Sequence, residues 1–467
     1  MKAVKSRKLG IWGALPNYIG GKRRICAVIF REIDRLLPRR NWRGLTFLDG
    51  FLGGGSVSIY AKAQGFHVTA CDVAERAMVV GEALIANSRV RLAREDVLRL
   101  LVPNNLPAGR VERELAPSTF TCDQARFIDR ALALAEATGD KAKAALFRLL
   151  AIRVAQLAHP LSQVRGGTIH RISSGDYESI TESCLHQYIS GLRLTHSARL
   201  WAIAQQINAG IFEGHGLAIR GSILDVLPTI NAAVFYADPP YANTLGYEKA
   251  YRVIDEMLEG SARSPSPFTA RDGASLLDTL FESAQHIPIW ILSFGNAVIT
   301  IEELASKMTR LGRQTRTVSL HYKHMPALAG PEKRRSNREF LVVGWDQEAL
   351  ERLMDGQGIT ARLDHPHAVA QVHVDASSGS AEPSPFVSGF HDGEESTEAS
   401  FHEEVALLAG EAVPEVGGDV NDPGALQVEA SLDRNLEGRV LGRVSLRHDP
   451  TFTDPAADGQ ACTEETK

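Results

Sequence analysis

The chain has 467 residues, which is more than one ordinary domain holds, so a core domain with an insertion or a tail is expected. Hydrophobic residues make up 44% of it and charged residues 23%, the balance of a soluble globular protein. No apolar run is long enough to cross a bilayer, and the first residues lead into no signal-peptide core. With these features a cytoplasmic protein is expected.

The cysteines do not suggest a metal site or a disulfide framework. All five are scattered and none forms a C-x-x-C pair, so they are expected to be small core or surface residues. Their positions are Cys26, Cys71, Cys122, Cys184 and Cys462.

The net charge of −5 is distributed unevenly along the chain. From residue 347 onward there are 7 Lys and Arg against 24 Asp and Glu, a net charge of −17. The preceding 346 residues carry 44 basic and 32 acidic side chains, a net charge of +12. A basic body suits a polyanionic partner, although arginines that serve only solubility would give the same balance. The division itself indicates a boundary between body and tail.

The first predicted elements alternate between strand and helix. Residues 44–49 indicate a short buried strand, a glycine cluster follows, and residues 57–63 have helical periodicity. Residues 67–72 predict a second strand that ends on Asp72, and a helix is expected around residues 74–88. A strand, a glycine loop, a helix and a strand ending on an acid form the opening of a nucleotide-binding doubly wound sheet.

The middle of the chain is predicted to be mainly helical. Ala-, Leu- and Arg-rich stretches at Gln124–Glu136, Lys141–Ala158 and His186–Asn208 have no sustained strand alternation. A loop rich in Gly, Ser and Arg, Arg165–Gly175, interrupts them. Residues 97–215 are therefore expected to form an inserted helical domain.

Strand patterns then return before the composition changes. Single strands are predicted at Gly216–Arg220, Ala232–Ala237 and Pro288–Ser293. A hairpin-like pair is predicted at Thr315–His321 and Arg338–Trp345, with a basic loop between its arms that contains Lys333, Arg334 and Arg335. Residues 1–96 and 216–350 are thus expected to form one discontinuous α/β domain. Residues 351–467 are expected to form an acidic, low-complexity tail that is disordered.

The segment Asp238-Pro239-Pro240-Tyr241 carries the clearest chemistry. It ends an apolar strand, and its two prolines fix the backbone and remove two N–H donors, so that carbonyl oxygens remain as acceptors. An exocyclic amine is a donor with a conjugated, weakly nucleophilic lone pair. A carboxylate and a carbonyl could accept both of its N–H bonds, while the tyrosine stacks on the base. A strand-ending Asp-Pro turn with a packed tyrosine is the structural alternative.

The glycine loop between residues 50 and 55 is expected to let the backbone approach a ligand closely. It has no lysine of a phosphate-binding loop, and Asp49 at the strand end would repel a phosphate. An acid there suits a cationic ligand such as S-adenosylmethionine, which carries an ammonium and a sulfonium. Asp72 lies about twenty residues on, where an acid holds ribose hydroxyls in nucleotide-binding folds. A purely structural turn is the alternative.

Near the N-terminus, residues 17–24 place an aromatic side chain, two glycines and a basic run before a predicted helix. By itself this stretch is equally typical of an ordinary helix-entry turn.

Together, these three stretches resemble the Dam-like family of N6-adenine-specific DNA methyltransferases. The family has K-W-x-G-G-K, then F-x-D-x-F-x-G-x-G-S-V, then D-P-P-Y, and the counterparts here are Asn17–Lys22, Phe47–Val57 and Asp238–Tyr241. The likeness covers roughly residues 15–90 and 216–346. It implies a Rossmann-like, doubly wound sheet dependent on S-adenosyl-L-methionine, with the helical insertion as target-recognition domain and the Arg165–Arg171 loop as a candidate DNA contact.

The resemblance also implies roles for individual residues. The catalytic set is Asp238, Pro239, Pro240 and Tyr241, which would hold a flipped adenine. The cofactor set is Tyr18, Gly21, Lys22, Asp49, Phe51, Gly53, Gly55, Asp72 and, as a further candidate, Asp225. The chain departs from the family at Asn17, where lysine is usual, and at Gly50, where proline or alanine is common.

The predicted function is site-specific transfer of a methyl group to N6 of adenine in double-stranded DNA, by direct attack and without a covalent enzyme intermediate. A cognate restriction endonuclease is a possible partner, and a monomer is expected. Cytosine N4, adenine in RNA and a glutamine amide are alternative acceptors on the same fold. A catalytically silent DNA-binding relative is a second alternative. A nicotinamide-dependent oxidoreductase is disfavoured because the glycines lack the G-x-G-x-x-G order.

Overall fold

Two units make up the computed structural model of the chain, residues 1–404 and residues 405–467, and each is described by itself. The structure describes residues 10–102, 107–158, 197–240, 250–261, 266–269, 273–295, 299–320, 339–355, 430–434 and 440–444. No helix among these residues is both long and apolar enough to span a membrane.

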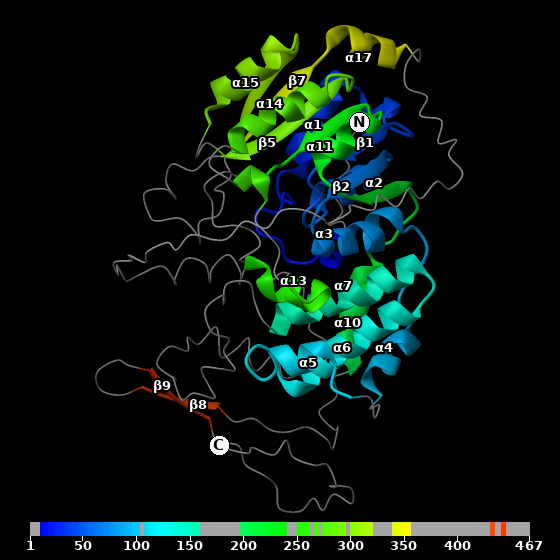
Figure 1. The fold of residues 1–467 in the computed structure, drawn as a ribbon, viewed down its shortest axis with the longest axis vertical. Coiled ribbons are helices and arrows are strands. Elements are labelled where there is room, and N and C mark those ends of the chain that lie inside the picture. The colour runs from blue at the N-terminus through cyan, green and yellow to red at the C-terminus, as the bar shows by residue number, and fades with distance from the viewer. Residues whose placement is uncertain are drawn as a thin grey trace, which may run out of the picture. The chain divides into compact units, whose positions relative to one another are not determined.

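The first unit contains a seven-stranded sheet, which lies in the upper part of Figure 1. Its order is β3-β2-β1-β4-β5-β7-β6, with neighbours parallel from β3 to β5 and antiparallel on both sides of β7. The fold class predicted from the sequence is confirmed, as is the antiparallel pairing of the last two strands. The strands are β1 (Thr46–Asp49), β2 (His67–Asp72), β3 (Gly216–Arg220), β4 (Val234–Ala237), β5 (Ile289–Gly295), β6 (Gln314–Leu320) and β7 (Glu339–Trp345).

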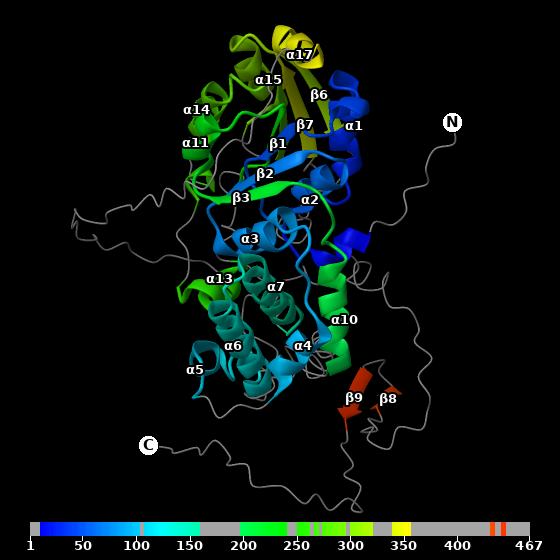
Figure 2. The ribbon, with the colours of Figure 1, turned by 90° about the vertical axis from the view of Figure 1, so that its right-hand side faces the viewer.

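Helices cover both faces of this sheet, as Figure 2 shows. One face is covered by α1 (Cys26–Leu36), α2 (Ser56–Ala63) and α3 (Glu75–Val80), and the other by α11 (Ile223–Val226), α14 (Leu276–Ser283) and α15 (Ile301–Arg310). Alternate side chains of each inner strand enter separate cores. Phe47, Val234 and Tyr236 belong to the first, and Leu48 and Phe235 to the second.

The strand order reverses between β1 and β4. From β1 the chain proceeds to β2 and β3 on one side, and later returns to place β4 on the other. In the register between them, Asp49 is opposite Tyr236, so Asp49 and Asp238 end their strands at the same edge of the sheet. Ligands of open α/β sheets bind at such a reversal, outside the carboxyl ends of the strands.

The helix expected around residues 74–88 consists of two parts. After α3 the backbone continues as a π-helix, Gly81–Ala86. A Cβ on Gly81 would lie 2.8 Å from Cβ of Ala218, so glycine lets this helix pack directly on β3. Nζ of buried Lys62 donates to the carbonyl oxygens of Leu84 (3.1 Å) and Asn87 (2.7 Å), which the helix end leaves without helical partners.

The described part of residues 97–215 is helical. It contains most of α4 (Arg94–Leu101), then α5 (Arg110–Leu115), α6 (Cys122–Ala137), α7 (Lys141–Ala158) and α10 (Ser197–Asn208). The helix predicted at Lys141–Ala158 begins where α7 begins and is helical throughout its length. In Figure 2 these helices lie beside α3, below the sheet. The Arg165–Arg171 loop and the basic loop at 333–335 lie outside the described residues.

The body extends past the boundary predicted at residue 350. Helix α17 (Gln347–Met354) places buried Leu350 and Leu353 against the first core, and its N-cap Asp346 accepts from the N–H of Ala349 at 3.0 Å. In the second unit, β8 (Ala430–Arg434) and β9 (Val440–Val444) pair as an antiparallel two-stranded sheet. This pair lies within the stretch for which no element was predicted.

Candidate active site

Asp238 directly follows β4 at the carboxyl edge of the sheet. Its Oδ2 lies 2.9 Å from Nζ of Lys22, and the two side chains are 21% and 3% exposed. The same Nζ lies 3.2 Å from Oε1 of Glu339, whose side chain is 0% exposed. One buried ammonium group is therefore shared by two carboxylates, of which only that of Asp238 is accessible to a ligand.

A tight turn brings Lys22 to this position. The N–H of Gly21 donates to the carbonyl oxygen of Tyr18 at 3.1 Å, and Gly20 has a φ of 77°, in the region that favours glycine. The N–H of Lys22 then donates to Oγ of Ser56 at 3.1 Å, and its Nζ also donates to the carbonyl oxygen of Gly20 at 3.0 Å. The stretch thus serves as the entry to α1 and also delivers its lysine to Asp238.

Asp49 is buried at the end of β1. Oγ of Ser58, in the first turn of α2, donates to its Oδ2 at 2.6 Å, and the N–H of Phe51 donates to its Oδ1 at 3.3 Å. Burial raises the pKa of Asp49 to about 7, although these two hydrogen bonds favour the charged form. The carboxylate is therefore poised to gain from a cation placed beside it.

The side chain of Tyr18 packs against the glycine loop. Cβ atoms built on Gly53 and Gly54 would lie 2.9 Å from Cε1 and 2.5 Å from Cβ of Tyr18. Gly53 and Gly55 have φ values of 50° and 75°, which an L side chain rarely adopts. Gly50 stands where the family commonly has proline or alanine. A Cβ at this position would lie 2.8 Å from the ring of Phe235, so this chain needs glycine there.

Replacing Gly54 with alanine tests this close approach. We expect the added methyl group to displace Tyr18 and lower the free energy of unfolding by about 1–3 kcal/mol. Urea denaturation followed by circular dichroism measures the change. Gly139→Ala is the control, because a Cβ there meets nothing within 4 Å. Equal stability of the two variants would show that Tyr18 does not pack on the loop.

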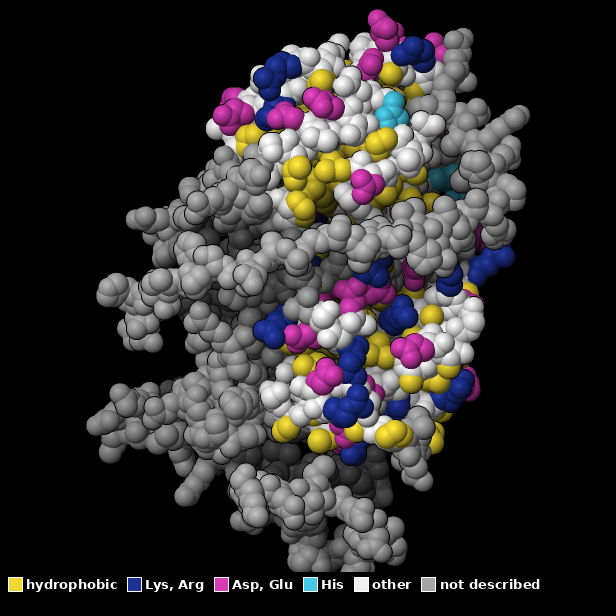
Figure 3. All heavy atoms as spheres, viewed as in Figure 1, with side chains coloured by type: hydrophobic (Ala, Val, Ile, Leu, Met, Phe, Trp, Pro, Cys, Tyr) yellow, Lys and Arg dark blue, Asp and Glu magenta, His cyan; other side chains and the backbone are white. Residues whose placement is uncertain are grey.

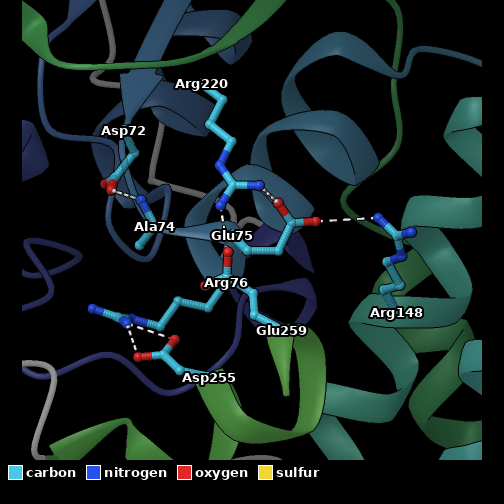
Figure 4. Close-up of polar contacts among 8 residues, drawn as sticks. All are labelled: Asp72, Ala74, Glu75, Arg76, Arg148, Arg220, Asp255 and Glu259. Atoms are coloured by element: carbon cyan, nitrogen blue, oxygen red, sulfur yellow. Dashed lines mark hydrogen bonds and ion pairs between the residues drawn. The ribbon is translucent and has the colours of Figure 1, made fainter. Parts of the chain in front are cut away.

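Asp72 ties the loop to the next helix. Its Oδ2 accepts from the N–H of Gly53 at 2.9 Å, and its Oδ1 accepts from the N–H of Ala74 at 2.9 Å, at the start of α3 (Figure 4). The acid at the end of β2 thus fixes the backbone of the glycine loop, and its side chain remains partly exposed at the same edge as Asp49.

Beyond Tyr18 the aromatic packing continues to a buried ion pair. Tyr18 stacks on Tyr251 with a centroid distance of 4.9 Å, and the guanidinium of Arg76 lies 4.6 Å from the Tyr251 ring centroid. Nη1 of Arg76 donates to both carboxylate oxygens of Asp255, at 2.7 Å to Oδ1 (Figure 4). Tyr251 immediately precedes α13 (Arg252–Glu259). The column formed by Tyr18, Tyr251, Arg76 and Asp255 therefore joins the glycine loop to α13.

A second set of charges surrounds this column nearer the surface. Glu75 accepts from Arg148 of α7 at 3.1 Å and from Arg220 of β3 at 2.9 Å, and Arg220 also pairs with Glu259 (Figure 4). These contacts connect the helical region, the edge of the sheet and α13. Because they are partly exposed, each contributes little stability by itself.

Several of these residues were not predicted from the sequence. In the sequence, Glu339 is only an acid at the start of an apolar strand, and nothing marks it as part of the site. Ser56 and Ser58 are only hydroxyl residues that follow the glycines. Nothing local in the sequence distinguishes Arg76, Tyr251 or Asp255 from ordinary helix residues.

Most of the residues predicted for the site lie at one edge of the sheet. The structure gathers Tyr18, Gly21, Lys22, Asp49, Gly53, Gly55, Asp72, Asp238 and Pro239 around the carboxyl ends of β1, β2 and β4. Phe51 packs edge-on against Phe268 at 5.1 Å, and Asp225 is exposed on α11. Pro240 is half-buried after Pro239, and Tyr241 lies outside the described residues.

Comparison with known proteins bears on this site. The model of the D12 class N6 adenine-specific DNA methyltransferase family matches residues 18–108, which include the turn, the glycine loop and Asp72. These residues are thus similar to the N6-adenine-specific DNA methyltransferases that the three motifs resemble. The chain is also similar to the Type II methyltransferase M2.HphI of Haemophilus parahaemolyticus, with 25% identity over 336 residues. That match covers 70% of this chain and 96% of the relative, so in a chain of 467 residues it must span Asp238.

Proposed function

We propose that the chain is a site-specific DNA methyltransferase that acts on N6 of a flipped-out adenine. The observation that carries this proposal is the position of Asp238, held by a buried lysine at the reversal of strand order. The carboxylate ends the strand next to β1, whose glycine loop and Asp49 lie at the same edge. An acceptor for an amino group and a site for a cationic donor are thus adjacent.

The residues around the glycine loop fit S-adenosylmethionine as the methyl donor. Asp49 is a buried carboxylate that a cation would stabilise, and Asp72 is an acid at the end of the neighbouring strand, where ribose hydroxyls bind in related folds. Tyr18, Lys22, Gly53 and Gly55 complete this surface. When bound, S-adenosylmethionine supplies a methyl group that is already activated by its sulfonium.

The protein's own contribution is then mainly orientation. Asp238 accepts an N–H of the adenine amino group, and the backbone carbonyl of Pro239 accepts the other, which draws the nitrogen toward tetrahedral geometry. Asp238 strengthens the nucleophile by hydrogen bonding, and the proton leaves for water only after attack. Correct alignment alone can lower such a barrier by about 7–11 kcal/mol.

The helical region is proposed to contact double-stranded DNA around the target base. The first 346 residues carry an excess of 12 positive charges, and phosphate contacts provide most non-specific affinity. On the face shown in Figure 3, Lys and Arg over the helices lie among Asp and Glu, so no single-sign patch gathers there. The similarity to a Type II methyltransferase favours a place in a restriction–modification pair.

Incubation with labelled S-adenosylmethionine tests the function. Purified protein is given double-stranded DNA, single-stranded DNA, RNA or a protein mixture, and labelled DNA is digested to nucleosides. We expect label in DNA, as N6-methyl-2′-deoxyadenosine, and sequencing of modified bases then gives the target site. Label in cytosine or only in RNA would assign the same fold to another amine. No label with any acceptor would indicate a silent relative.

The affinity for S-adenosylmethionine is expected to depend on pH through Asp49. With a pKa of about 7, this carboxyl is mostly protonated at pH 6, and binding a cation must first release that proton. The affinity should therefore rise by up to about tenfold per pH unit below pH 7 and level off above it. Titration calorimetry in two buffers of different ionisation enthalpy measures both the affinity and the released proton.

Ser58→Ala provides the control for this assignment. The variant removes a hydrogen bond that favours the charged form of Asp49, so the rise in affinity should move to higher pH.

The raised pKa of Asp49 also affects the stability of the unliganded protein, which it should lower as pH rises. The folded state binds more protons than the unfolded state between the ordinary aspartate pKa and about 7, so the contribution of Asp49 to stability decreases as pH rises through that interval. An affinity independent of pH would contradict the proposed role of Asp49.

A further inference from the structure

Glu339 is a fully buried acid at the start of β7. It is opposite Gly295 of β5 and Leu320 of β6 in the sheet register, at the carboxyl end of β5. Oγ of buried Ser293 donates to its Oε1 at 2.7 Å, and Nζ of Lys22 lies 3.2 Å from the same oxygen. A polar group therefore occupies a strand whose other inward residues, Leu341 and Val343, belong to the first hydrophobic core.

This burial is costly for the fold. Removal of a carboxylate from water is unfavourable even when it is paired, and apolar side chains at the same place would often be as stable or more so. If Lys22 served only to pair with Asp238, Glu339 would be unnecessary. Its presence means that Nζ of Lys22 is held on two sides, by Oε1 of Glu339 and by Oδ2 of Asp238.

We propose that Glu339 is a positioning residue for methyl transfer, acting on Asp238 through Lys22. It holds the ammonium at one place between two carboxylates and takes a share of its positive charge. Asp238 is thereby kept in orientation and remains a strong hydrogen-bond acceptor for the target amino group. This inference rests on the proposed function, because it assigns Asp238 the role of acceptor.

Other groups also act on Asp238. They include Lys22, with Glu339 on its other side, Asp49 at the end of β1, and the phenols of Tyr18 and Tyr236. Burial raises the pKa of both tyrosines, so they are neutral across the pH range of the experiment. Neutralising Glu339 changes one charge in this set. The full charge of Lys22 then acts on Asp238, which favours the charged form of this carboxylate and weakens it as a hydrogen-bond acceptor.

Glu339→Gln tests the proposal because it keeps the shape and removes the charge. We expect kcat for DNA methylation to fall about tenfold to a hundredfold, with the KM values for cofactor and DNA little changed. The acidic limb of the pH profile of kcat should move to lower pH. The matched control is Glu32→Gln, which neutralises another buried glutamate, one paired with Arg35 and Arg316 outside the site. It should leave kcat unchanged.

Each other outcome decides against the proposal or against its premise. An unchanged kcat with only a lower melting temperature would make Glu339 a structural residue. A raised KM for the cofactor with unchanged kcat would place the effect of Glu339 at the glycine loop and overturn the proposal.

A second variant, Ser293→Ala, serves if Glu339→Gln does not fold. It keeps both charges and removes the hydrogen bond that orients Glu339, so kcat should also fall. An unaltered kcat in this variant overturns the proposal. If the wild-type protein methylates no DNA, it is the proposed function that fails.

Discussion

Replacing Asp238 with alanine is expected to abolish methyl transfer while leaving cofactor binding largely intact. The variant loses the carboxylate that accepts the amino group, and removal of one preorganised hydrogen-bonding partner costs about 10²–10³-fold in kcat. Loss of alignment adds to this. Single-turnover transfer from labelled S-adenosylmethionine to DNA, together with calorimetric cofactor affinity, measures the two effects separately.

The folded state should survive this substitution because Lys22 keeps a partner. Its Nζ remains 3.2 Å from Oε1 of Glu339, so no buried charge is left without compensation. Glu302→Ala, which removes an exposed acid from α15, is the control for general effects of charge. Unchanged methylation by the Asp238 variant would refute the role assigned to this residue.

Asp255→Ala is expected to cause the largest loss of stability. Arg76 and Asp255 are both buried, and removal of the acid leaves the guanidinium without its carboxylate. Breaking such a pair from one side costs about 3–5 kcal/mol. The free energy of unfolding from urea denaturation should fall by that amount, and the stack of Tyr18 on Tyr251 should loosen with it.

Two controls separate this effect from a general loss of charge. Glu112→Ala breaks the ion pair with Arg126, whose side chain is 52% exposed, and should cost less than about 1 kcal/mol. The double variant Arg76→Met with Asp255→Leu replaces both charges by apolar groups and should recover much of the loss. A double variant as unstable as Asp255→Ala would show that the aromatic contact of Arg76, and not the ion pair, provides the stability.

The sequence was sufficient for the sheet and for one half of the site. Apolar runs ending on an acid predicted β1, β2 and β4, and parallel strands necessarily bring such ends to one edge, so Asp49, Asp72 and Asp238 could be placed together. The turn and the glycine loop were recognisable because only glycine allows their backbone conformations.

The remaining residues of the site could not be predicted, because their positions depend on how distant segments pack in the folded chain. Glu339 reaches Lys22 only because β7 inserts antiparallel between β5 and β6, and no local pattern around residue 339 specifies that insertion. Arg76 and Asp255 lie on helices that meet only in the folded chain. The continuation of the body through α17 was not predicted for a similar reason, since Leu350 and Leu353 are recognisable as core residues only when the sheet is known.

The insertion of β7 also bears on when during synthesis the protein can become active. Lys22 leaves the ribosome 317 residues before Glu339, which belongs to the last strand of the seven-stranded sheet. Contacts between such distant segments form late, because the entropy of closing the intervening loop opposes them until the rest of the fold is in place. A nascent chain that already carries the glycine loop and Asp238 therefore lacks the full cluster. An unfinished polypeptide released at that stage would have Lys22 without its buried partner Glu339.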